Sequence, residues 1–597
     1  MLRITSTIMD RFLIEVSFEA GNKVGGIWTV LTSKSSYIKK LFGDDYLAIG
    51  FYNPVQAAVE FMESPPPQFI KDAVGDIKLD GVKIYFGRWS SANDVNILLI
   101  DAKEFENKHI NEVKKEFWDG FKIDSLSSPP DYNEPLAWSY AAGAVIEALC
   151  KSIKKEIVVQ VHEWLSAGAI LYLKSRKTHV PTVFTIHATV LGRAISYSGG
   201  NTNTYVMSNT GITPDMPYKY GVAAKHFTEK AGAFNATIFT AVSSVIAKEA
   251  EIILGKKADF VTINGIDTDN LPETDELSVM RINAKKKFNS FLNAYFLPYY
   301  DMNLGSTRVF VTSGRYEFYD KGYDVFIDSL GKLNKMLTDD NYVIAMIAVP
   351  SGTIGVKNEV VANYLTYMSI KSALDEDLKN FDSVISSSIA MKEETVDRAY
   401  SKMINDSKRL LKQLRRPKPT NPPLIPFMLS YPENNDAILN KLHENGLDNS
   451  AENHVKVIFY PKYLAVGDEL LNLTYYEVLA LSTAGFFLSK YEPFGYTPLE
   501  AAAYMSISFT SDYSGFGQYL LNDYKSLYKG IFVEKMLGRK REDCISQIAK
   551  DMMKITLMNE DDLLKLKISA NEIANQFGWE RFLPVYLQSY DAALKKI

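Results

Sequence analysis

The sequence predicts an α/β protein with two parallel sheets. Short apolar runs rich in β-branched residues recur along the 597 residues, and each is followed by a Gly-rich or polar turn and then by a helical pattern. This alternation is typical of βαβ units, which build parallel sheets. The runs are residues 11–18, 156–161, 182–186, 237–242, 260–263, 308–312, 342–349, 456–460, 485–488 and 507–510.

Ten runs are more than one sheet holds comfortably, so we expect two sheets. The pattern lapses between Gly265 and Arg308, where a polar helix and a stretch containing Tyr and Pro stand. The first sheet should therefore end near Ile266, and the second should begin near Arg308. Segments 64–68 and 125–133 are Pro-rich and predict surface turns.

Two further helical segments complete this frame. Residues 357–416 form a long polar helical pattern inside the second half, and RRPKPTNPP at 415–423 ends it, because proline stops a helix. Residues 560–597 are again helical. They carry apolar side chains able to dock on another element, namely Trp579, Phe582, Leu583, Val585 and Tyr586.

The composition argues against several classes of function. Lys and Arg number 66 against 71 Asp and Glu, so no basic field exists for bulk nucleic-acid binding. Two cysteines exclude a disulfide scaffold and a thiolate metal cluster, and they suit a reducing compartment. No apolar run approaches the ~18 residues of a membrane span, and no signal peptide is recognisable. We therefore expect a soluble, cytoplasmic protein without membrane or nucleic-acid partners.

In open parallel sheets, ligands bind beyond the carboxyl ends of the strands, so informative residues should follow the strands. The first strand is followed by GNKVGGI at 21–27, where Gly25 and Gly26 open a helical pattern. Such a turn presents free N–H groups to an anion, and Lys23 adds a full charge. A plain strand-to-helix turn explains these residues equally well, because the pattern is neither a Walker loop nor GxGxxG.

Histidines follow two neighbouring strands of the predicted first sheet. His162 comes directly after 156–161, and His187 comes directly after 182–186 with Arg193 close behind. A lone histidine at a strand end is more often a hydrogen-bonded structural residue than a catalyst. Two that end successive strands should face one crevice, which favours a functional role. The turn NGID at 264–267 has a simpler interpretation as a tight turn.

Two cations follow the first strand of the second sheet. The segment SGRYEFYDKG at 313–322 places Arg315 and Lys321 just before an amphipathic helix. A helix N-terminus disfavours cations by a few tenths of a kcal/mol to ~1 kcal/mol. A bound diphosphate therefore explains their placement better than a solvated surface pair does.

The segment EPFGYTPLE at 492–500 follows another predicted strand. Glu492 ends that strand beside a glycine and has no helix-capping role. Glu500 has one, because Thr497 as N-cap and Pro498 at the first helical position would complete a T-x-x-E capping box, so a structural and a functional role stand equal. The backbone amides that could bind phosphate at this helix start are those of Gly495, Tyr496 and Thr497.

With these residues in place, the sequence resembles the animal and fungal type of glycogen synthase over most of its length. The resemblance rests on motifs in the family's order: NKVGGIWTVLTSK, HEWLSAGAIL, FTIHATVLGR, FTAVSSVIAKEAE with VTINGID, SGRYEFYDKGYDVFIDSLGKLN, VKVIFYPKYL, and YEPFGYTPLEAAAYMSISFTSDYSGFG. It implies the GT-B fold, in which two Rossmann-like domains face each other across a cleft. It also implies transfer of glucose from a nucleotide-glucose to the 4-hydroxyl of a glucan end, with retention and with no metal or other cofactor.

The resemblance assigns roles residue by residue. Arg315 and Lys321 would hold the donor diphosphate, Glu492 would be the essential carboxylate at the donor glucose, and His162 would lie near the transferred glucose. The remaining residues implied in donor binding are Lys23, Gly25, Gly26, His187, Arg193, Gly495, Tyr496, Thr497 and Glu500. The implied partners are UDP-glucose or ADP-glucose, with uridine favoured, and an α-1,4-glucan acceptor such as glycogen.

The resemblance also implies an organisation of the chain. Residues 1–290 would be the acceptor-side domain, and 291–575 the nucleotide-sugar domain with the helical insertion at 357–416. Residues 576–597 would form a helix that packs back on the first domain. The insertion matches one that mediates subunit contacts in the family, which predicts a homo-oligomer.

The sequence departs from the family's pattern in several places. Phe494 stands where Trp is usual, and Trp28 where Tyr is usual, so both sites keep an aromatic face. Residues 555–579 contain no arginine, although animal and fungal members carry there an arginine-dense helix that senses glucose 6-phosphate. We therefore expect an unregulated member of bacterial or archaeal type.

Two alternatives remain beside glycogen synthesis. One is a retaining GT-B enzyme that makes a disaccharide or a small glucoside. The other is a non-catalytic glucan-binding relative, which is disfavoured because a decayed enzyme would be expected to lose at least one of the five polar residues Lys23, His162, Arg315, Lys321 and Glu492.

Overall fold

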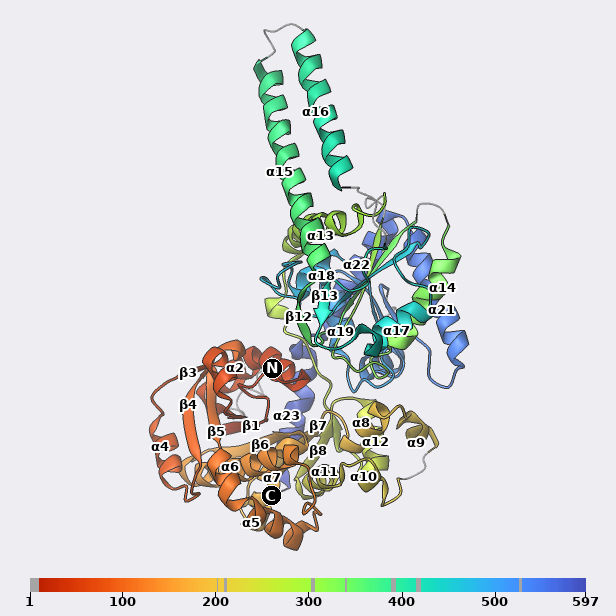
Figure 1. Cartoon of the computed structure of the whole chain (residues 1–597). Helices are drawn as coiled ribbons and strands as arrows, with labels where there is room; N and C mark the ends of the chain where they lie inside the picture. The colour runs from red at the N-terminus through yellow and green to blue at the C-terminus, as the bar shows by residue number, and fades with distance from the viewer. Residues whose placement is uncertain are drawn as a thin grey trace.

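The computed structural model describes residues 10–200, 202–208, 212–301, 307–338, 341–387, 393–414, 420–524 and 529–596. Figure 1 shows two lobes, each built around a sheet, with the amino-terminal half in one lobe and most of the carboxyl-terminal half in the other. The final helix α23 (Trp579–Lys595) crosses back to the first lobe. None of the described helices is long and apolar enough to span a membrane.

The first lobe contains a nine-stranded sheet of order β3-β4-β5-β2-β1-β6-β7-β8-β9. From β5 to β9 every neighbouring pair is parallel, whereas β3 and β4 add an antiparallel edge. The strands are β1 Arg11–Val16, β2 Tyr46–Phe51, β3 Phe61–Glu63, β4 Lys83–Trp89, β5 Val95–Asp101, β6 Glu156–His162, β7 Thr182–Ile186, β8 Ile238–Ala241 and β9 Phe260–Val261.

The sequence predicts the part of this sheet that follows the βαβ pattern. β1 and β6 to β9 match five of the predicted runs, but β2 to β5 were not among them. The antiparallel strands β3 to β5 are joined by short turns or by helix α4 alone, so a search for strand–turn–helix units overlooks them. β2, a buried parallel strand between α2 and α3, also lies outside the predicted runs.

The second lobe contains a six-stranded parallel sheet of order β14-β11-β10-β15-β16-β17 and a small antiparallel pair, β12-β13. Among the described residues, β9 is the last strand of the first sheet and β10 is the first of the second, as the lapse in the pattern predicts. The strands are β10 Arg308–Ser313, β11 Val343–Ala348, β12 Thr353–Val356, β13 Phe427–Leu429, β14 Val455–Tyr460, β15 Ala484–Phe487, β16 Ile507–Ser511 and β17 Ile531–Glu534.

Helices cover both faces of each sheet, so each sheet buries apolar side chains on its two faces. The first lobe's helices are α2 Gly26–Phe42, α3 Pro54–Glu60, α4 Gln68–Gly75, α5 Lys103–Phe121, α6 Pro130–Ser152, α7 Glu163–Ser175, α8 Val190–Tyr197, α9 Thr202–Ser208, α10 Met216–Lys219, α11 Ala223–Asn235 and α12 Ser244–Ile253. The others are α13 Thr274–Phe296, α14 Tyr323–Met336, α15 Asn358–Ser387, α16 Glu393–Leu414, α17 Ala437–Glu444, α18 Tyr475–Leu481, α19 Tyr496–Ala503, α20 Gly515–Asn522, α21 Arg541–Leu557, α22 Glu560–Ala574 and α23.

Helix α6 begins inside a segment predicted to be a turn. The prolines at 129 and 130 stand at the N-cap and the first helical position, where the missing N–H of proline leaves no intrahelical bond unmade. Segment 125–133 is thus a turn only up to its prolines. The final helix α23 buries Trp579, Tyr586 and Tyr590 against α2 and the first sheet.

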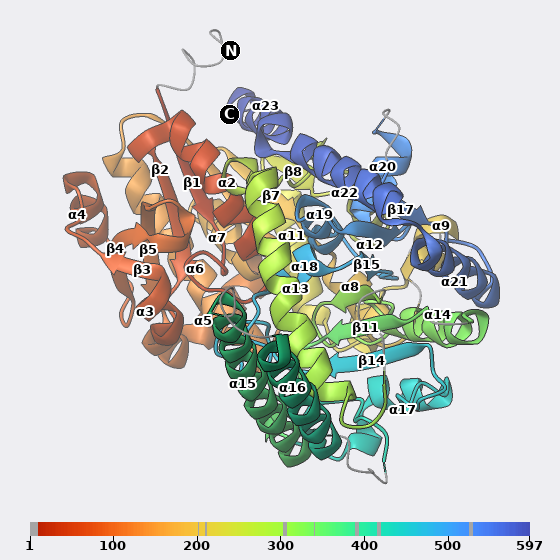
Figure 2. The same ribbon diagram turned by 90° about the horizontal axis from the view of Figure 1, so that it is seen from above.

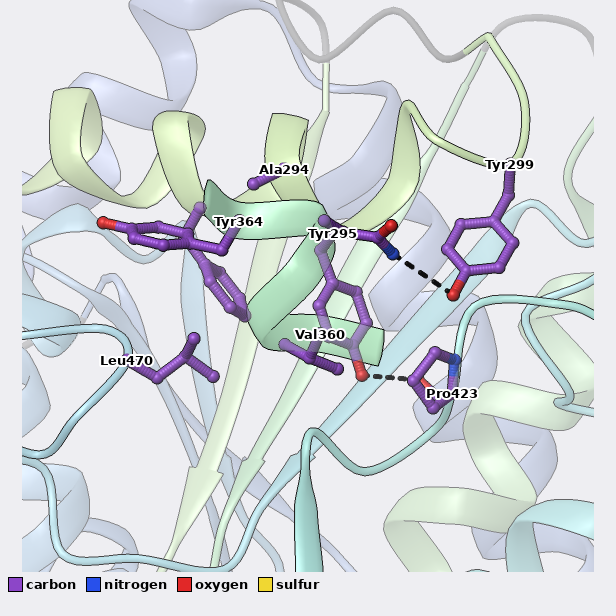
Figure 3. Close-up of a pocket in the computed structure, with 9 residues that line it drawn as sticks. Ala294, Tyr295, Tyr299, Val360, Tyr364, Pro423 and Leu470 are labelled. Carbon is purple, nitrogen blue, oxygen red and sulfur yellow. Dashed lines mark hydrogen bonds between the residues drawn. The ribbon is translucent and has the colours of Figure 1, made fainter. Parts of the chain in front are cut away.

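The helical insertion is an antiparallel pair, α15 and α16, that projects from the second lobe (Figures 1 and 2). Its base is anchored on α13 through a shallow aromatic pocket, shown in Figure 3, to which Tyr364 and Val360 of α15 contribute. In this pocket the Tyr295 hydroxyl donates to the Pro423 carbonyl at 2.6 Å. The proline-rich end predicted at 415–423 lies partly outside the described residues, and α16 ends at Leu414.

Candidate active site

Glu492 and Lys321 meet at the ends of neighbouring strands of the second sheet. Lys321 lies beyond β10 and Glu492 lies beyond β15, and these strands are parallel partners. Lys321 Nζ donates to Glu492 Oε2 at 2.6 Å, and each side chain is 17% exposed. Ser489 Oγ donates to the same carboxylate oxygen at 3.3 Å. The pair is therefore fixed in place while remaining open to a ligand.

Gly495 brings the start of α19 close to this carboxylate. Gly495 is the N-cap residue of α19, and its φ of 109° is a conformation that residues with a side chain rarely adopt. A Cβ at this position would lie 3.3 Å from Glu492 Cγ. The helix begins at Tyr496, so the capping box predicted with Thr497 as N-cap and Pro498 at the first helical position does not form. Thr497 and Pro498 instead lie inside the first turn.

Glu500 has a different partner from the one that a capping box requires. Its Oε2 accepts a hydrogen bond from the Tyr475 hydroxyl at 3.1 Å. Burial raises the pKa of Glu500 to about 7, against the lowering effects of Tyr475 and of the positive charge of Lys23 from the first lobe. Glu500 is thus a buried carboxyl poised near neutral pH at the interface between the lobes.

This pKa predicts a pH dependence of donor affinity. The resemblance implies that Glu500 contacts the ribose of the donor nucleotide. Glu500 is neutral below about pH 7 and ionised above it, and the ionised form is the better acceptor for hydroxyl groups. Affinity for a nucleotide-glucose donor, whose diphosphate diester does not titrate in this range, should therefore rise as pH increases from 6 to 8. Calorimetric titration across that range checks it, and Glu500→Gln should flatten the dependence. An unchanged slope in that variant would contradict the assignment.

Arg315 lies on the loop between β10 and α14. Its guanidinium pairs with Glu317 at 3.0 Å and is largely exposed. The Tyr323 hydroxyl donates to the Arg315 carbonyl at 3.1 Å, which fixes the loop backbone at this residue. Gly322, the N-cap of α14 with φ of 68°, lets the helix begin directly after Lys321. The loop thus carries both cations between β10 and α14, with Lys321 on Glu492 and Arg315 on Glu317.

The Gly-rich turn of the first lobe is arranged differently from the prediction. The backbone N–H of Gly25, expected to be free for an anion, donates to Glu19 Oε2 at 3.0 Å, and the N–H of Trp28 donates to the same oxygen at 2.8 Å. A Cβ on Gly25 would lie 2.9 Å from Glu19 Oε1, so glycine is needed for this approach. Gly26 meets no such neighbour. Lys23 is exposed with Nζ 4.3 Å from the Trp28 ring centroid.

His162 and His187 bind each other at the ends of β6 and β7. His162 Nδ1 lies 2.9 Å from His187 Nε2, and His162 Nε2 lies 2.8 Å from Glu15 Oε1. The His162 side chain has no exposed surface, whereas His187 remains 9% exposed. The ring of His162 is therefore occupied on both nitrogens, and His187 is the histidine nearer to solvent.

Three buried carboxylates hold the loop of His187 and the start of α8. Glu163 accepts from the N–H groups of His187 and Ala188 at 2.7 and 2.8 Å, and it does so with a left-handed φ of 65°. Glu229 accepts from the N–H of Val190, and Glu249 accepts from Thr189. These acidic residues were not predicted, although their position on otherwise apolar helix faces signals buried partners.

Arg193, on the first turns of α8, faces these carboxylates from the interface between the lobes. The negative charges of Glu163, Glu317 and Glu492 all act on its guanidinium. Arg193 is exposed to solvent. It therefore adds a cation from the first lobe to the side on which Lys321 and Glu492 lie.

Hydrogen bonds between the lobes cluster around the same residues. The Tyr491 hydroxyl donates to Glu249 Oε1 at 2.9 Å, Ser196 Oγ bonds Asp320 at 2.5 Å, and Ser243 Oγ donates to the Pro493 carbonyl at 2.6 Å. The second-lobe residues in these bonds are direct neighbours in sequence of Lys321 or Glu492. They are Asp320, Tyr491 and Pro493. The structure thus places contacts between the lobes beside Lys321 and Glu492.

The arrangement of two parallel-sheet lobes with polar residues at the facing strand ends is that of GT-B glycosyltransferases. The solved catalytic domain of starch synthase IV from Arabidopsis thaliana, bound to ADP and acarbose, matches with a TM-score of 0.56 at 14% identity and covers 98% of this chain and 99% of that chain. A UDP-forming α,α-trehalose-phosphate synthase from Burkholderia vietnamiensis matches with a TM-score of 0.50 at 10% identity and covers 98% and 100%.

Sequence similarity places the chain within this class. The family described as Glycogen synthase matches residues 15–597, so the chain belongs to the glycogen synthase family. The glycogen [starch] synthase of Neurospora crassa is 29% identical and covers 99% of this chain and 84% of that protein. That of Dictyostelium discoideum is 28% identical, covering 100% and 68%, and isoform 2 of Saccharomyces cerevisiae is 27% identical, covering 99% and 87%.

Proposed function

We propose that this protein is a glycogen (starch) synthase that transfers glucose from UDP-glucose or ADP-glucose to the non-reducing 4-hydroxyl of an α-1,4-glucan with retention. The observation that carries the proposal is the hydrogen-bonded pair of Lys321 and Glu492 at the interface of the lobes in a member of this family. In glucose transfer the bond between the anomeric carbon and the diphosphate breaks. A fixed cation can stabilise the negative charge on the diphosphate, and a neighbouring carboxylate can stabilise the positive charge on the sugar.

The charges of the site match those that develop during transfer. The bond between the anomeric carbon and the diphosphate breaks, the bond to the acceptor oxygen forms, and the acceptor proton leaves with the diphosphate. Arg315 and Lys321 stabilise the negative charge on the diphosphate, with Lys23 and Arg193 added from the first lobe. Glu492 stabilises the positive charge on the sugar ring.

The backbone at the start of α19 completes the diphosphate site. The N–H groups of Gly495, Tyr496 and Thr497 are at the helix N-terminus, where the backbone dipoles favour a negative charge. Contacts between the lobes, such as that of Tyr491 with Glu249, hold the two sides of this site together. Closure excludes water, which would otherwise hydrolyse the donor.

We propose UDP-glucose as the preferred donor, no metal or other cofactor, and turnover without glucose 6-phosphate. The animal and fungal resemblance supports uridine, and the fixed cations supply the charge that a metal would otherwise supply. Helix α22, which has no arginine, supports the last point, and Arg308 beside it is already paired with Glu560.

Transfer of radiolabelled glucose to glycogen tests these points together. UDP-glucose and ADP-glucose are supplied separately, each with excess EDTA, and each with and without glucose 6-phosphate. We expect incorporation from UDP-glucose that neither EDTA nor glucose 6-phosphate changes by more than about twofold. Absence of polymer labelling with both donors would overturn the proposal, and labelling of free glucose instead would indicate a small-glucoside product.

We further propose a homo-oligomer that forms through the hairpin of α15 and α16. Val361, Leu365 and Met368 lie at helical spacing on one face of α15 and are 39%, 60% and 39% exposed. Leu378, further along the helix, is 53% exposed. An exposed apolar stripe on a projecting hairpin suits pairing with the same stripe of a second copy.

Light scattering of the purified protein should therefore give a molar mass above that of one chain. The double substitution Leu365→Glu and Met368→Glu should shift it to the monomer, because charges desolvated at an interface oppose association. Thr366→Glu adds a charge on the same helix about a quarter-turn away and serves as the control. A monomeric wild type, or equal loss of association in the control, would overturn the proposal.

A further inference from the structure

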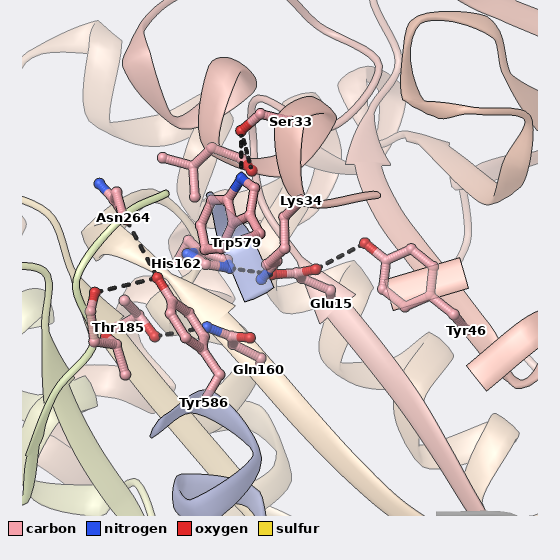
Figure 4. A network of polar contacts seen from close by, with 12 residues as sticks. Glu15, Ser33, Lys34, Tyr46, Gln160, His162, Thr185, Asn264, Trp579 and Tyr586 are labelled. Atoms are coloured by element: carbon pink, nitrogen blue, oxygen red, sulfur yellow. Dashed lines mark hydrogen bonds and ion pairs between the residues drawn. The ribbon is translucent and has the colours of Figure 1, made fainter. Parts of the chain in front are cut away.

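Glu15, near the carboxyl end of β1, is a buried carboxylate surrounded by three donors. Its Oε1 accepts from Lys34 Nζ at 2.5 Å and lies 2.8 Å from His162 Nε2, while its Oε2 accepts from the Tyr46 hydroxyl at 2.7 Å. Neither Glu15 nor Lys34 has any exposed side-chain surface. Figure 4 shows these groups converging from β1, α2, β2 and β6 close to the final helix.

The final helix α23 seals Lys34 from solvent. Lys34 Nζ lies 4.8 Å from the ring centroid of Tyr586 and 6.0 Å from that of Trp579. Trp579 Nε1 donates to Ser33 Oγ at 2.9 Å, which fixes the indole over the helix that carries Lys34. A buried ammonium in such a place is strongly stabilised only by a charged partner, and Glu15 is that partner.

The charge balance of this pair determines where the protons lie on the two histidines. An ionised carboxylate only accepts hydrogen bonds, so His162 Nε2 carries the proton that faces Glu15. A neutral His162 then has a bare Nδ1, which accepts from the Nε2–H of His187. A neutral His187 is left with a bare Nδ1, a hydrogen-bond acceptor on the edge of the ring away from His162.

Both histidines are held neutral by their surroundings. Burial lowers the pKa of His162, and the Lys34 charge adds to this effect against the opposing effect of Glu15. Burial also lowers the pKa of His187 well below its ordinary value, helped by His162 and Lys34. Burial alone would raise the pKa of Glu15, but Lys34 and His162 together hold it well below its usual range.

We infer that Lys34 and Glu15 are positioning residues for glucose transfer, because Lys34 neutralises Glu15, keeps His162 neutral, and so leaves Nδ1 of His187 as an acceptor for a hydroxyl of the donor sugar. This inference rests on the proposed function. Lys34 itself is sealed in the core and touches no ligand. Its effect reaches the site through the chain of hydrogen bonds from Glu15 to His162 to His187.

Removal of the ammonium and removal of the carboxylate charge should have different effects. In Lys34→Met the buried Glu15 lacks a counter-ion, so His162 takes a second proton as its replacement. Its Nδ1–H then donates to His187 Nε2, and the proton of His187 moves to Nδ1. The acceptor at the sugar site becomes a donor, and we expect kcat to fall about 10²-fold.

In Glu15→Gln the amide oxygen is held toward the two strongest donors, Lys34 and His162, and the amide NH₂ faces Tyr46. His162 keeps its proton on Nε2 and His187 keeps its bare Nδ1. We expect kcat within about tenfold of wild type, although the unpaired buried ammonium lowers the melting temperature. A purely structural role predicts the opposite order, with Glu15→Gln at least as damaging as Lys34→Met.

Nitrogen NMR of ¹⁵N-histidine-labelled protein reads the protons directly and does not depend on turnover. Wild type and Glu15→Gln should show both rings protonated on Nε2 only, and Lys34→Met should show His162 protonated on both nitrogens. Tyr46→Phe removes the third donor to Glu15 without changing charge, and it should keep both tautomers and keep kcat within about threefold. The resonances of the two rings are assigned with His187→Gln.

The outcomes separate this inference from the proposed function. A wild type with the proton of His187 on Nδ1 overturns the inference even if glucose transfer is normal. If Lys34→Met does not fold, the wild-type spectrum alone still decides that point. A wild type with the expected tautomers but no glucose transfer from either donor overturns the proposed function and with it the sugar-binding role of His187.

Discussion

Glu492→Gln is expected to reduce glucose transfer by about 10³-fold while leaving the fold intact. The amide has the same shape as the carboxylate and can still accept from Lys321 and Ser489, which contact Glu492 Oε2 at 2.6 and 3.3 Å. What it lacks is the negative charge that stabilises the developing positive charge on the sugar ring. The loss should therefore appear in kcat, measured as labelled glucose transferred to glycogen, and only weakly in the affinity for UDP-glucose.

Glu500→Gln is the matched control for this substitution. Glu500 lies on the same segment and is also partly buried, but its carboxyl group is bonded to the Tyr475 hydroxyl and not to a cation. Its loss should change KM for the donor more than kcat. Equal melting temperatures of wild type and Glu492→Gln would show that the fold is kept. A kcat of Glu492→Gln within tenfold of wild type would remove Glu492 from the chemistry.

The sequence predicts those parts of the site that follow a strand–turn pattern. Lys321 and Glu492 each follow a predicted strand. These strands, β10 and β15, are parallel neighbours, so their carboxyl ends lie side by side. The same argument places His162 beside His187. Strand ends on one edge of a sheet are therefore a reliable guide to which side chains meet.

Contacts that need tertiary packing could not be predicted in this way. The Gly25 N–H donates to the carboxylate of Glu19, which lies six residues upstream and folds back on the start of α2. No local sequence pattern predicts this contact. Glu15 and Lys34 each look like an isolated charge in an apolar strand or helix. Only the packing of α2 on β1 beneath α23 shows that they pair. The sequence could have indicated a partner for each of Glu15 and Lys34, because a charged residue within an apolar element is buried only when it is paired.

Lys321→Ala should reduce kcat by at least about 10²-fold, because its ammonium offsets the charge that gathers on the departing diphosphate. The lysine is held by Glu492 at 2.6 Å and is only 17% exposed, so its charge acts at a fixed point with little screening. Affinity for UDP should fall as well, since the product carries more negative charge than the bound donor. Rapid-quench measurement of a single turnover separates the transfer step from product release.

Lys490→Ala provides the control for a change of charge alone. Lys490 stands two residues before Glu492, but its Nζ donates to Asp324 at 2.6 Å. Its charge therefore lies at the first turn of α14. Loss of this lysine removes the same charge from the same region and should leave kcat within about threefold of wild type. If Lys321→Ala and Lys490→Ala were equally impaired, Lys321 would act through the overall positive potential of the region and not through contact with the diphosphate. Recovery of part of the rate in Lys321→Arg would support contact, because arginine restores the charge at the same point with a different geometry.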